Sequence, residues 1–432
     1  MTAVTEDASP VPRKSVVSWA LYDWANSAFA TTVMAGFFPV FFKQYWDTGS
    51  DAATSTLHLG AANSLASLVI VILAPVLGAV ADSGGARKRF LGFFLMLGVV
   101  GTAALYWVGQ GEWMAALAFL VLGTIGFAGG NIFYDSLLVD VSNAKNSDRV
   151  SALGYSFGYL GGGVLFGINV AMTLKPDLFH LGDAATAVRV SFLTVAAWWF
   201  LFAIPLFVHV REGGRRTEQH WSQTVRGAFA QLRATFKQIR SLRTTFLFLL
   251  AYWLYIDGVD TIIRMAVDYG LALGFESNSL IVALLITQFV GFPAALFFGW
   301  LGGRIGTKSA LYVALAVYVG VTFWGYFLDN VTEFYAMAIT IGLVQGGVQA
   351  LSRSMYSRLI PQHAAAEFFG FYNMLGKFAA VIGPLLVGWV AVLTGNPRAG
   401  ILSILVLFIA GGVLLAFVNE EEGRKAAQAA EL

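Results

Sequence analysis

Long apolar segments, separated by short stretches of charged and turn-forming residues, run through the whole chain. A helix needs about 20 predominantly apolar residues to cross the hydrocarbon core of a bilayer. Twelve segments meet this requirement, with approximate spans of 16–42, 59–81, 90–110, 114–138, 150–173, 189–209, 244–270, 278–300, 309–328, 333–356, 367–392 and 400–418. They lack the period-two alternation of barrel strands, and a helix satisfies its own backbone hydrogen bonds in lipid. The pattern therefore predicts an all-α integral membrane protein with twelve transmembrane helices.

The basic residues are distributed unequally between the two sides of these twelve helices. Of the 27 Lys and Arg residues, 21 fall on the side of the N-terminus, five fall on the opposite side, and Lys377 lies inside the eleventh span. Connections retained in the cytoplasm are enriched in Lys and Arg. We therefore expect both termini to be cytoplasmic. The first 15 residues show no apolar run ending in a cleavage site, so no signal peptide is predicted.

The longest connection divides the predicted helices six and six. We predict an N-terminal tail at 1–15, one half at 16–209, a linker at 210–243, a second half at 244–419 and a C-terminal tail at 420–432. From Val225 to Leu242 the linker alternates apolar and basic residues at helical spacing. This pattern indicates a basic amphipathic helix lying on the anionic inner leaflet of the bilayer. A helix that docks onto a partner protein is the alternative.

The composition excludes several classes of function. Hydrophobic residues make up 57% of the chain and charged residues 12%, about half the charged fraction of soluble domains. The net charge of +2 gives no reason to expect a nucleic-acid partner, and the absence of cysteine excludes disulfides and thiolate metal sites. We expect no metal, no bound cofactor and a monomer. The segment GYSFG at 154–158 matches a nucleophile elbow, but no strand precedes it and no histidine lies in the interior of a span, so we predict no enzyme.

The two predicted halves contain internal repeats. Gly126 and Gly154 have counterparts at Gly342 and Gly370, each 216 residues later. Repeats of this kind indicate two parallel six-helix halves, related by an axis along the membrane normal, with a substrate site between them.

A second repeat lies in two short turns, GAVADSGGARK after the second span and GWLGGRIGTK after the eighth. These turns resemble the G-x-x-x-D-R-x-G-R-[RK] loop of the major facilitator superfamily. The matching residues are Gly78, Asp82, Gly85 and Arg87 in the first copy, and Gly299, Arg304, Gly306 and Lys308 in the second. Other positions of the loop depart from the pattern, so the resemblance implies weaker conformational locking by this motif.

Four longer runs make the resemblance more specific. WALYDWANSAFATTV, AYWLYIDGVDTI, QGGVQALSRSMYSRLIP and FFGFYNMLGKFAAVIGPLLVG, in the first, seventh, tenth and eleventh spans, are similar to the vacuole-effluxer family. That family includes autophagy-related vacuolar amino-acid exporters of fungi and bacterial relatives. The resemblance covers essentially the whole chain and implies an amino-acid transporter with the major facilitator fold. Its likeness to the bacterial members implies a bacterial inner (plasma) membrane.

Polar residues inside the predicted helices gather in the first, fourth, seventh and tenth spans. An ionisable group at the bilayer centre costs about 2.5 to 3.5 kcal/mol on insertion scales, so each one is a functional-site hypothesis. Spacings of three, four, seven or eight place each set on one helix face. The third, ninth and twelfth spans carry no charged residue. In the architecture that the resemblance implies, helices 1, 4, 7 and 10 line the central cavity, which agrees with this distribution.

We predict that a polar cavity binds the substrate. Its candidate residues are Tyr22, Asp23, Asn26, Asn131, Tyr134, Tyr255, Asp257, Gln345, Gln349, Tyr372, Asn373 and Lys377. Asp257 and Asp260 lie near the middle of their helix and are the candidates for proton coupling, because burial makes a carboxylate easier to protonate. A static ion pair of Asp260 with Arg264, four residues later, is the alternative. Lys377 either neutralises Asp257 or binds a substrate carboxylate.

Three charged residues lie toward the cytoplasmic ends of their helices. Asp135 and Arg353 occupy matching places in the two halves, with Asp23 at a similar depth. A pair across the halves would close the cytoplasmic side and break when the cavity opens inward. Separate structural pairs are the alternative reading.

We therefore expect a secondary active transporter of small polar solutes, with amino acids as the leading class, working by alternating access and driven by a proton gradient. The alternatives are a proton-coupled exporter of other metabolites or drugs and a membrane receptor or scaffold that does not transport.

Overall fold

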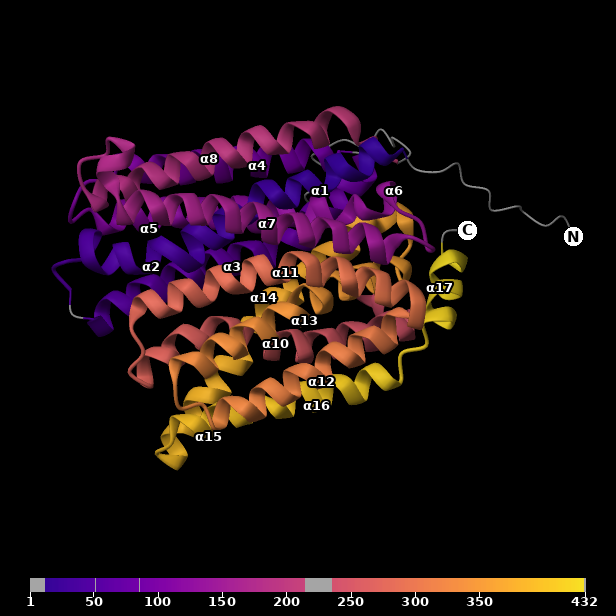
Figure 1. Ribbon diagram of the computed structural model, residues 1–432. Coiled ribbons are helices and arrows are strands. Elements are labelled where there is room, and N and C mark those ends of the chain that lie inside the picture. The colour runs from indigo at the N-terminus through magenta and orange to yellow at the C-terminus, as the bar shows by residue number, and fades with distance from the viewer. Residues whose placement is uncertain (1–11, 51, 85, 214–234, 431–432) are drawn as a thin grey trace, which may run out of the picture.

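The computed structural model describes residues 12–50, 52–84, 86–213 and 235–430 (Figure 1). Over these residues the chain is built of helices and contains no β-strand. Because the apolar runs are long and bounded by turn residues, each predicted span corresponds to one long helix or to consecutive helical segments. The fold is therefore all-α, as the hydrophobic pattern predicts.

The first half contains six helical rods. The first is interrupted by two π-helical stretches and consists of α1 (Arg13–Ala28), η1 (Phe29–Phe37), α2 (Phe38–Phe41) and η2 (Phe42–Trp46). The others are α3 (Ala52–Gly84), α4 (Arg87–Ala104) with η3 (Leu105–Trp107), α5 (Trp113–Ser136) with α6 (Leu138–Val141), α7 (Ser147–Leu174) followed by η4 (Pro176–Phe179), and α8 (Ala184–His209).

The second half repeats this arrangement. Its rods are α10 (Arg243–Ala272), α11 (Ser277–Ile305), α12 (Thr307–Tyr326), α13 (Val331–Arg358), η5 (Gln362–Ala364) leading into α14 (Ala365–Thr394), and α15 (Pro397–Ser403) with α16 (Leu405–Ala416). A further helix, α17 (Glu420–Ala429), lies in the predicted C-terminal tail.

Ten of these rods are long and apolar enough, over the residues that the structure describes, to cross a membrane. The other two predicted spans correspond to α3 and α14, which contain 33 and 30 residues. Each half has its own buried apolar core. Large apolar side chains such as Phe93 and Val392 lie on the outside, 62% and 82% exposed, as expected where a helix faces lipid.

The internal repeat is visible in the contacts of two lysines. The ammonium group of Lys88, at the start of α4, donates to the carbonyls of Phe207 and Val210 at the end of α8. The ammonium group of Lys308, at the start of α12, donates to the carbonyls of Ala416, the last residue of α16, and Val418. In both halves a lysine from the repeated turn thus caps the carboxyl end of the last helix, where unpaired carbonyls favour a cation.

The first residues of α1, the helix α17 and the turns before α4 and α12 lie at the same end of the bundle, which we call the terminal end (Figure 1). The opposite end, with η2 and η4, is the far end. Of the predicted linker helix, residues 214–234 lie outside the described residues. Beyond them, Ile239 and Leu242 are buried in the core of the second half.

The two halves meet where α7 lies against α11 and α13 and where α3 lies against α14. Gly78 of the first repeated turn makes one of these approaches possible. A Cβ atom on Gly78 would lie within 2.4 Å of the Ala366 carbonyl oxygen, closer than any side chain can come. Only glycine therefore permits this separation of α3 and α14 at the terminal end.

Candidate functional site

A polar cavity of about 290 Å³ lies between the two halves. Helices α1, α5 and α7 of the first half and α10, α11, α13 and α14 of the second contribute to its wall. The predicted residues that line it are Asp23, Asn26, Asn131, Tyr134, Asp135, Gln345, Gln349, Arg353, Tyr372 and Asn373. The polar faces of the first, fourth and tenth predicted spans thus converge on one space.

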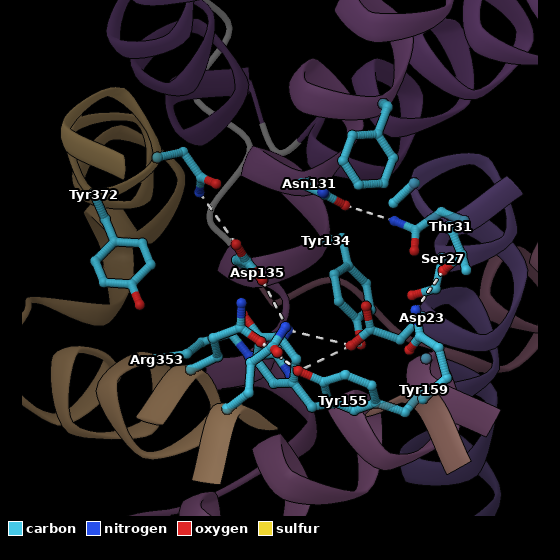
Figure 2. A pocket seen from close by; sticks show the side chains of 18 of the residues that line it. Asp23, Ser27, Thr31, Asn131, Tyr134, Asp135, Tyr155, Tyr159, Arg353 and Tyr372 are labelled. Carbon is cyan, nitrogen blue, oxygen red and sulfur yellow. Dashed lines mark hydrogen bonds and ion pairs between the residues drawn. The ribbon is translucent and has the colours of Figure 1, made fainter. Parts of the chain in front are cut away.

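An ion pair joins the halves beside this cavity. Figure 2 shows the guanidinium of Arg353 between Asp23 and Asp135. Its Nη1 atom lies 3.0 Å from Oδ1 of Asp135 and 3.4 Å from Oδ2 of Asp23. The arginine comes from α13, whereas the two acids come from α1 and α5. The arginine side chain is 1% exposed, so the pair is largely removed from solvent.

The rest of the Arg353 guanidinium is also occupied by the first half. Its Nε and Nη2 atoms donate to the hydroxyl and the carbonyl of Ser151, each at 2.9 Å. The rings of Tyr155, Trp19 and Tyr134 surround the guanidinium carbon, with centroids at 4.2, 4.9 and 5.4 Å. Cation–π attraction of this kind grows when the cation is desolvated.

A second network closes the bundle farther toward the terminal end. Arg358, at the last residue of α13, lies 3.0 Å from Asp148 of α7 and 2.7 Å from Glu420 of α17. Asp148 also accepts hydrogen bonds from Ser354 and Thr307 of the second half. Two successive layers of buried charge therefore connect the halves between the cavity and the terminal end.

The repeated loop motif contributes to the same closure. Arg87 pairs with Asp140 at 3.1 Å and donates to the carbonyl of Gln362 in the second half at 3.2 Å. Arg304 lies over the ring of Trp300. Two predicted motif residues, Asp82 by its side chain and Gly85 entirely, lie outside the described residues.

On the far side, the polar cavity adjoins an apolar cavity of about 220 Å³, and the two share several wall residues. At their boundary the amide of Gln288 donates to the hydroxyl of Thr31 at 2.8 Å. Thr31 belongs to η1 and Gln288 to α11, so this hydrogen bond also links the halves. Nearby, the hydroxyl of Tyr159 donates to Gln349 at 3.0 Å.

Three predicted cavity residues lie away from the polar cavity. Tyr22 is buried against the ring of Tyr134. Tyr255 hydrogen-bonds Ser352 at 2.7 Å and joins α10 to α13. Asp257 accepts the backbone N–H of Gly383 at 3.0 Å, between α10 and α14. These side chains hold helices together in this conformation rather than lining the polar cavity.

The remaining charged residues of the prediction divide into two groups. Asp260 is partly buried on α10 and is not part of the wall of the polar cavity. The side chains of Arg264 and Lys377 lie outside the described residues, so their predicted ion pair and substrate contact stay predictions.

Sequence reasoning missed residues that the structure places in the site. Tyr155 and Tyr159 belong to the glycine-rich start of α7, where closely spaced glycines predict close packing of helices rather than a polar site. Asp148 and Arg358 lie just outside their predicted spans and count there as surface charges of the loops. One signal could have revealed them: they carry opposite charges in the two halves, at the end of the bundle where α7 begins and α13 ends.

Comparison with known proteins decides the family. The sequence profile described as "Vacuole effluxer Atg22 like" matches residues 50–141 and 139–428. The uncharacterized MFS-type transporter YxiO of Bacillus subtilis is 42% identical over 413 residues, which cover 95% of this chain and 96% of YxiO. The chain belongs to the vacuole effluxer Atg22-like family.

The fungal relatives of this Atg22-like protein are more distant and longer. Autophagy-related protein 22 of Yarrowia lipolytica is 28% identical over 322 residues, covering 67% of this chain but 54% of the fungal protein. The chain thus matches about half the length of that relative.

Solved structures support the fold. The human organic anion transporter MFSD10 has a TM-score of 0.70 at 16% identity, covering 93% of this chain and 99% of MFSD10. The proton:xylose symporter XylE has a TM-score of 0.72 at 11% identity, covering 97% of this chain and 98% of XylE. The Atg22-like protein therefore has the major facilitator fold. Its family and its 42% identity to the MFS-type transporter YxiO make it an MFS-type integral membrane transporter rather than an enzyme.

Proposed function

We propose that this Atg22-like protein is a secondary active transporter of small polar solutes, amino acids first among them, that works by alternating access and is driven by a proton gradient. The observation that carries the proposal is the polar cavity between the two halves, closed toward the terminal end by ion pairs that cross from one half to the other. Such pairs can break as a unit when the halves rock.

The composition of the cavity supports a polar solute. Its wall combines carboxylates, a guanidinium, amides and tyrosine hydroxyls, whereas the adjoining cavity on the far side is mostly apolar. A volume of about 290 Å³ suits a solute of amino-acid size rather than a large substrate. The terminal-end orientation toward the cytoplasm rests on the distribution of basic residues and belongs to the proposal.

Proton coupling is assigned to the acids of α10. Asp257 is 1% exposed and accepts a backbone N–H from α14. Loss or gain of a proton there would change the contact between α10 and α14, two helices that both reach the cavity. This links a titration to the movement of cavity walls without requiring the acid to touch the solute.

Solute uptake into proteoliposomes tests the proposal, with amino acids screened under an imposed pH gradient. We expect gradient-driven accumulation of at least one amino acid, and its loss in Asp257→Asn or Asp260→Asn. Asp329→Asn serves as the control, because Asp329 is an exposed acid paired with Arg398 far from the cavity. Uptake that responds to neither the gradient nor the α10 variants would make the protein a facilitator. Specific binding without flux would make it a receptor.

A further inference from the structure

The charges around the polar cavity do not balance among the residues that the structure describes. Two carboxylates, Asp23 and Asp135, line it together with one guanidinium, Arg353. The guanidinium is 1% exposed, whereas 12% of the Asp23 side chain and 9% of the Asp135 side chain remain accessible. A solute in the cavity therefore has access to more carboxylate surface than guanidinium surface.

The two acids are held differently. One oxygen of Asp135 pairs with Arg353 at 3.0 Å and the other accepts from Asn373 at 3.1 Å. Asp23 receives the arginine only at 3.4 and 3.5 Å, on the same oxygen that accepts the Tyr134 hydroxyl at 2.8 Å. None of the hydrogen bonds described reaches its other oxygen. Asp23 is thus the acid with capacity left for a further donor.

The surroundings of Asp23 also favour a cation. Tyr155 and Tyr159 line the cavity beside it, and a tyrosine oxygen can accept a hydrogen bond from an ammonium group. Arg353, the described basic residue of the wall, is already saturated by two acids and by Ser151. An anionic solute would find no described cation available, whereas an ammonium group would neutralise the excess carboxylate.

We propose that Asp23 is the recognition site for an ammonium group of the solute, so that the transporter selects solutes carrying a primary amine and rejects those without one. This proposal rests on the proposed function and narrows its substrate class to amines and zwitterions. Asp135 keeps Arg353 while the ammonium group binds to Asp23. Solute binding and closure of the terminal end are then linked through one shared cluster of charges.

The test uses purified full-length protein and matched probes. Each amino acid of a panel is compared with the carboxylic acid that has hydrogen in place of its amine, and with the amine that lacks its carboxylate. Binding is followed by the shift of the thermal unfolding midpoint, and flux by uptake into proteoliposomes. We expect binding of amino acids and amines and none of the deaminated acids. Because a charged hydrogen bond is lost, Asp23→Asn should weaken amine binding by about 10- to 100-fold.

Three controls keep the result interpretable. Asp23→Glu should restore part of the affinity, because it restores the carboxylate. Asp329→Asn should leave the preference for amines unchanged. Lys377→Gln tests whether Lys377, whose side chain lies outside the described residues, binds the carboxylate of the solute.

Several outcomes would overturn the inference. Equal binding of deaminated acids and amino acids by the unaltered protein needs no variant and refutes the ammonium site directly. A preference for amines that persists in Asp23→Asn would move the site elsewhere. A preference for deaminated acids that disappears in Lys377→Gln would assign the cavity to anions. Flux without an amine requirement would reject this inference alone, whereas specific binding without flux of any probe would reject the proposed function.

Discussion

Replacement of Arg353 by glutamine should open the terminal end of the bundle. In the closed conformation the guanidinium donates to Asp135, Asp23 and Ser151. Truncation leaves two buried carboxylates without their cation, and breaking a buried pair in this way costs about 3 to 5 kcal/mol. That cost applies only to the conformation in which the pair is formed. The equilibrium between closed and open terminal ends should therefore shift by about 10²- to 10⁴-fold.

The absence of cysteine makes the measurement direct, because introduced cysteines are the only labelling sites. Spin labels at Lys145→Cys and His363→Cys report across the halves, since both residues are exposed and their neighbours line one small cavity at the terminal end. We expect a longer inter-label distance in Arg353→Gln. Arg398→Gln, which removes a partly exposed far-end arginine, should leave the distance unchanged.

A combined variant separates charge from shape. If the uncompensated carboxylates cause the opening, Asp135→Asn added to Arg353→Gln should return part of the population to the closed distance, because fewer buried charges remain unpaired. A distance distribution in Arg353→Gln that superimposes on that of the unaltered protein would refute the reasoning.

Three further predictions concern packing and closure. Gly126→Ala would place a Cβ within 2.4 Å of the α4 backbone, so the unfolding midpoint in detergent should fall by the equivalent of about 1 to 3 kcal/mol. Gly320→Ala, with no atom within 4 Å, is its control and should be neutral or stabilising. Thr31→Val removes the hydrogen bond to Gln288 between the two cavities, so bound solute should dissociate faster; an unchanged dissociation rate would count against a far-side constriction. Glu420→Gln removes an ion pair of α17 and should speed hydrogen exchange in α17 without lowering the global unfolding midpoint.

The fold was predictable because lipid imposes simple rules on the chain. Twelve spans are long enough to cross a bilayer, and the longest connection divides them six and six. The repeat of Gly126 at Gly342 then indicates that the two halves are parallel copies. The repeated turns predict that their last residues, Lys88 and Lys308, occupy equivalent places in the two halves. In the structure each of them donates to carbonyls at the end of the last long helix of its own half. The helix α17 is polar and short, so hydropathy carries no signal for it.

The site was predictable only where depth and helix face suffice. Asp23, Asn131 and Gln345 line the cavity because their spans direct one polar face inward. The same reasoning selects Asp257, which instead accepts the backbone N–H of Gly383. A helix face has a width of several residues, and whether a side chain on it meets a cavity or a neighbouring helix depends on rotation and tilt, which periodicity does not specify.

Pairing between distant residues was the least predictable feature. The contact of Asp148 with Arg358 depends on where α7 and α13 end relative to each other. Residues 210 positions apart come together only after both halves have packed. Sequence analysis assigns each of them to a loop, and the structure shows that they close the terminal end.

Crosslinking of the terminal end tests most directly the claim that transport requires its opening. The hydroxyls of Ser147 and Ser354, from opposite halves, lie 3.0 Å apart, so cysteines at both positions are placed to form a disulfide. We expect oxidation of this double variant to abolish solute flux in proteoliposomes, and reduction to restore it, with both single variants unaffected by the oxidant. Undiminished flux through the disulfide-bonded protein would contradict alternating access through this end.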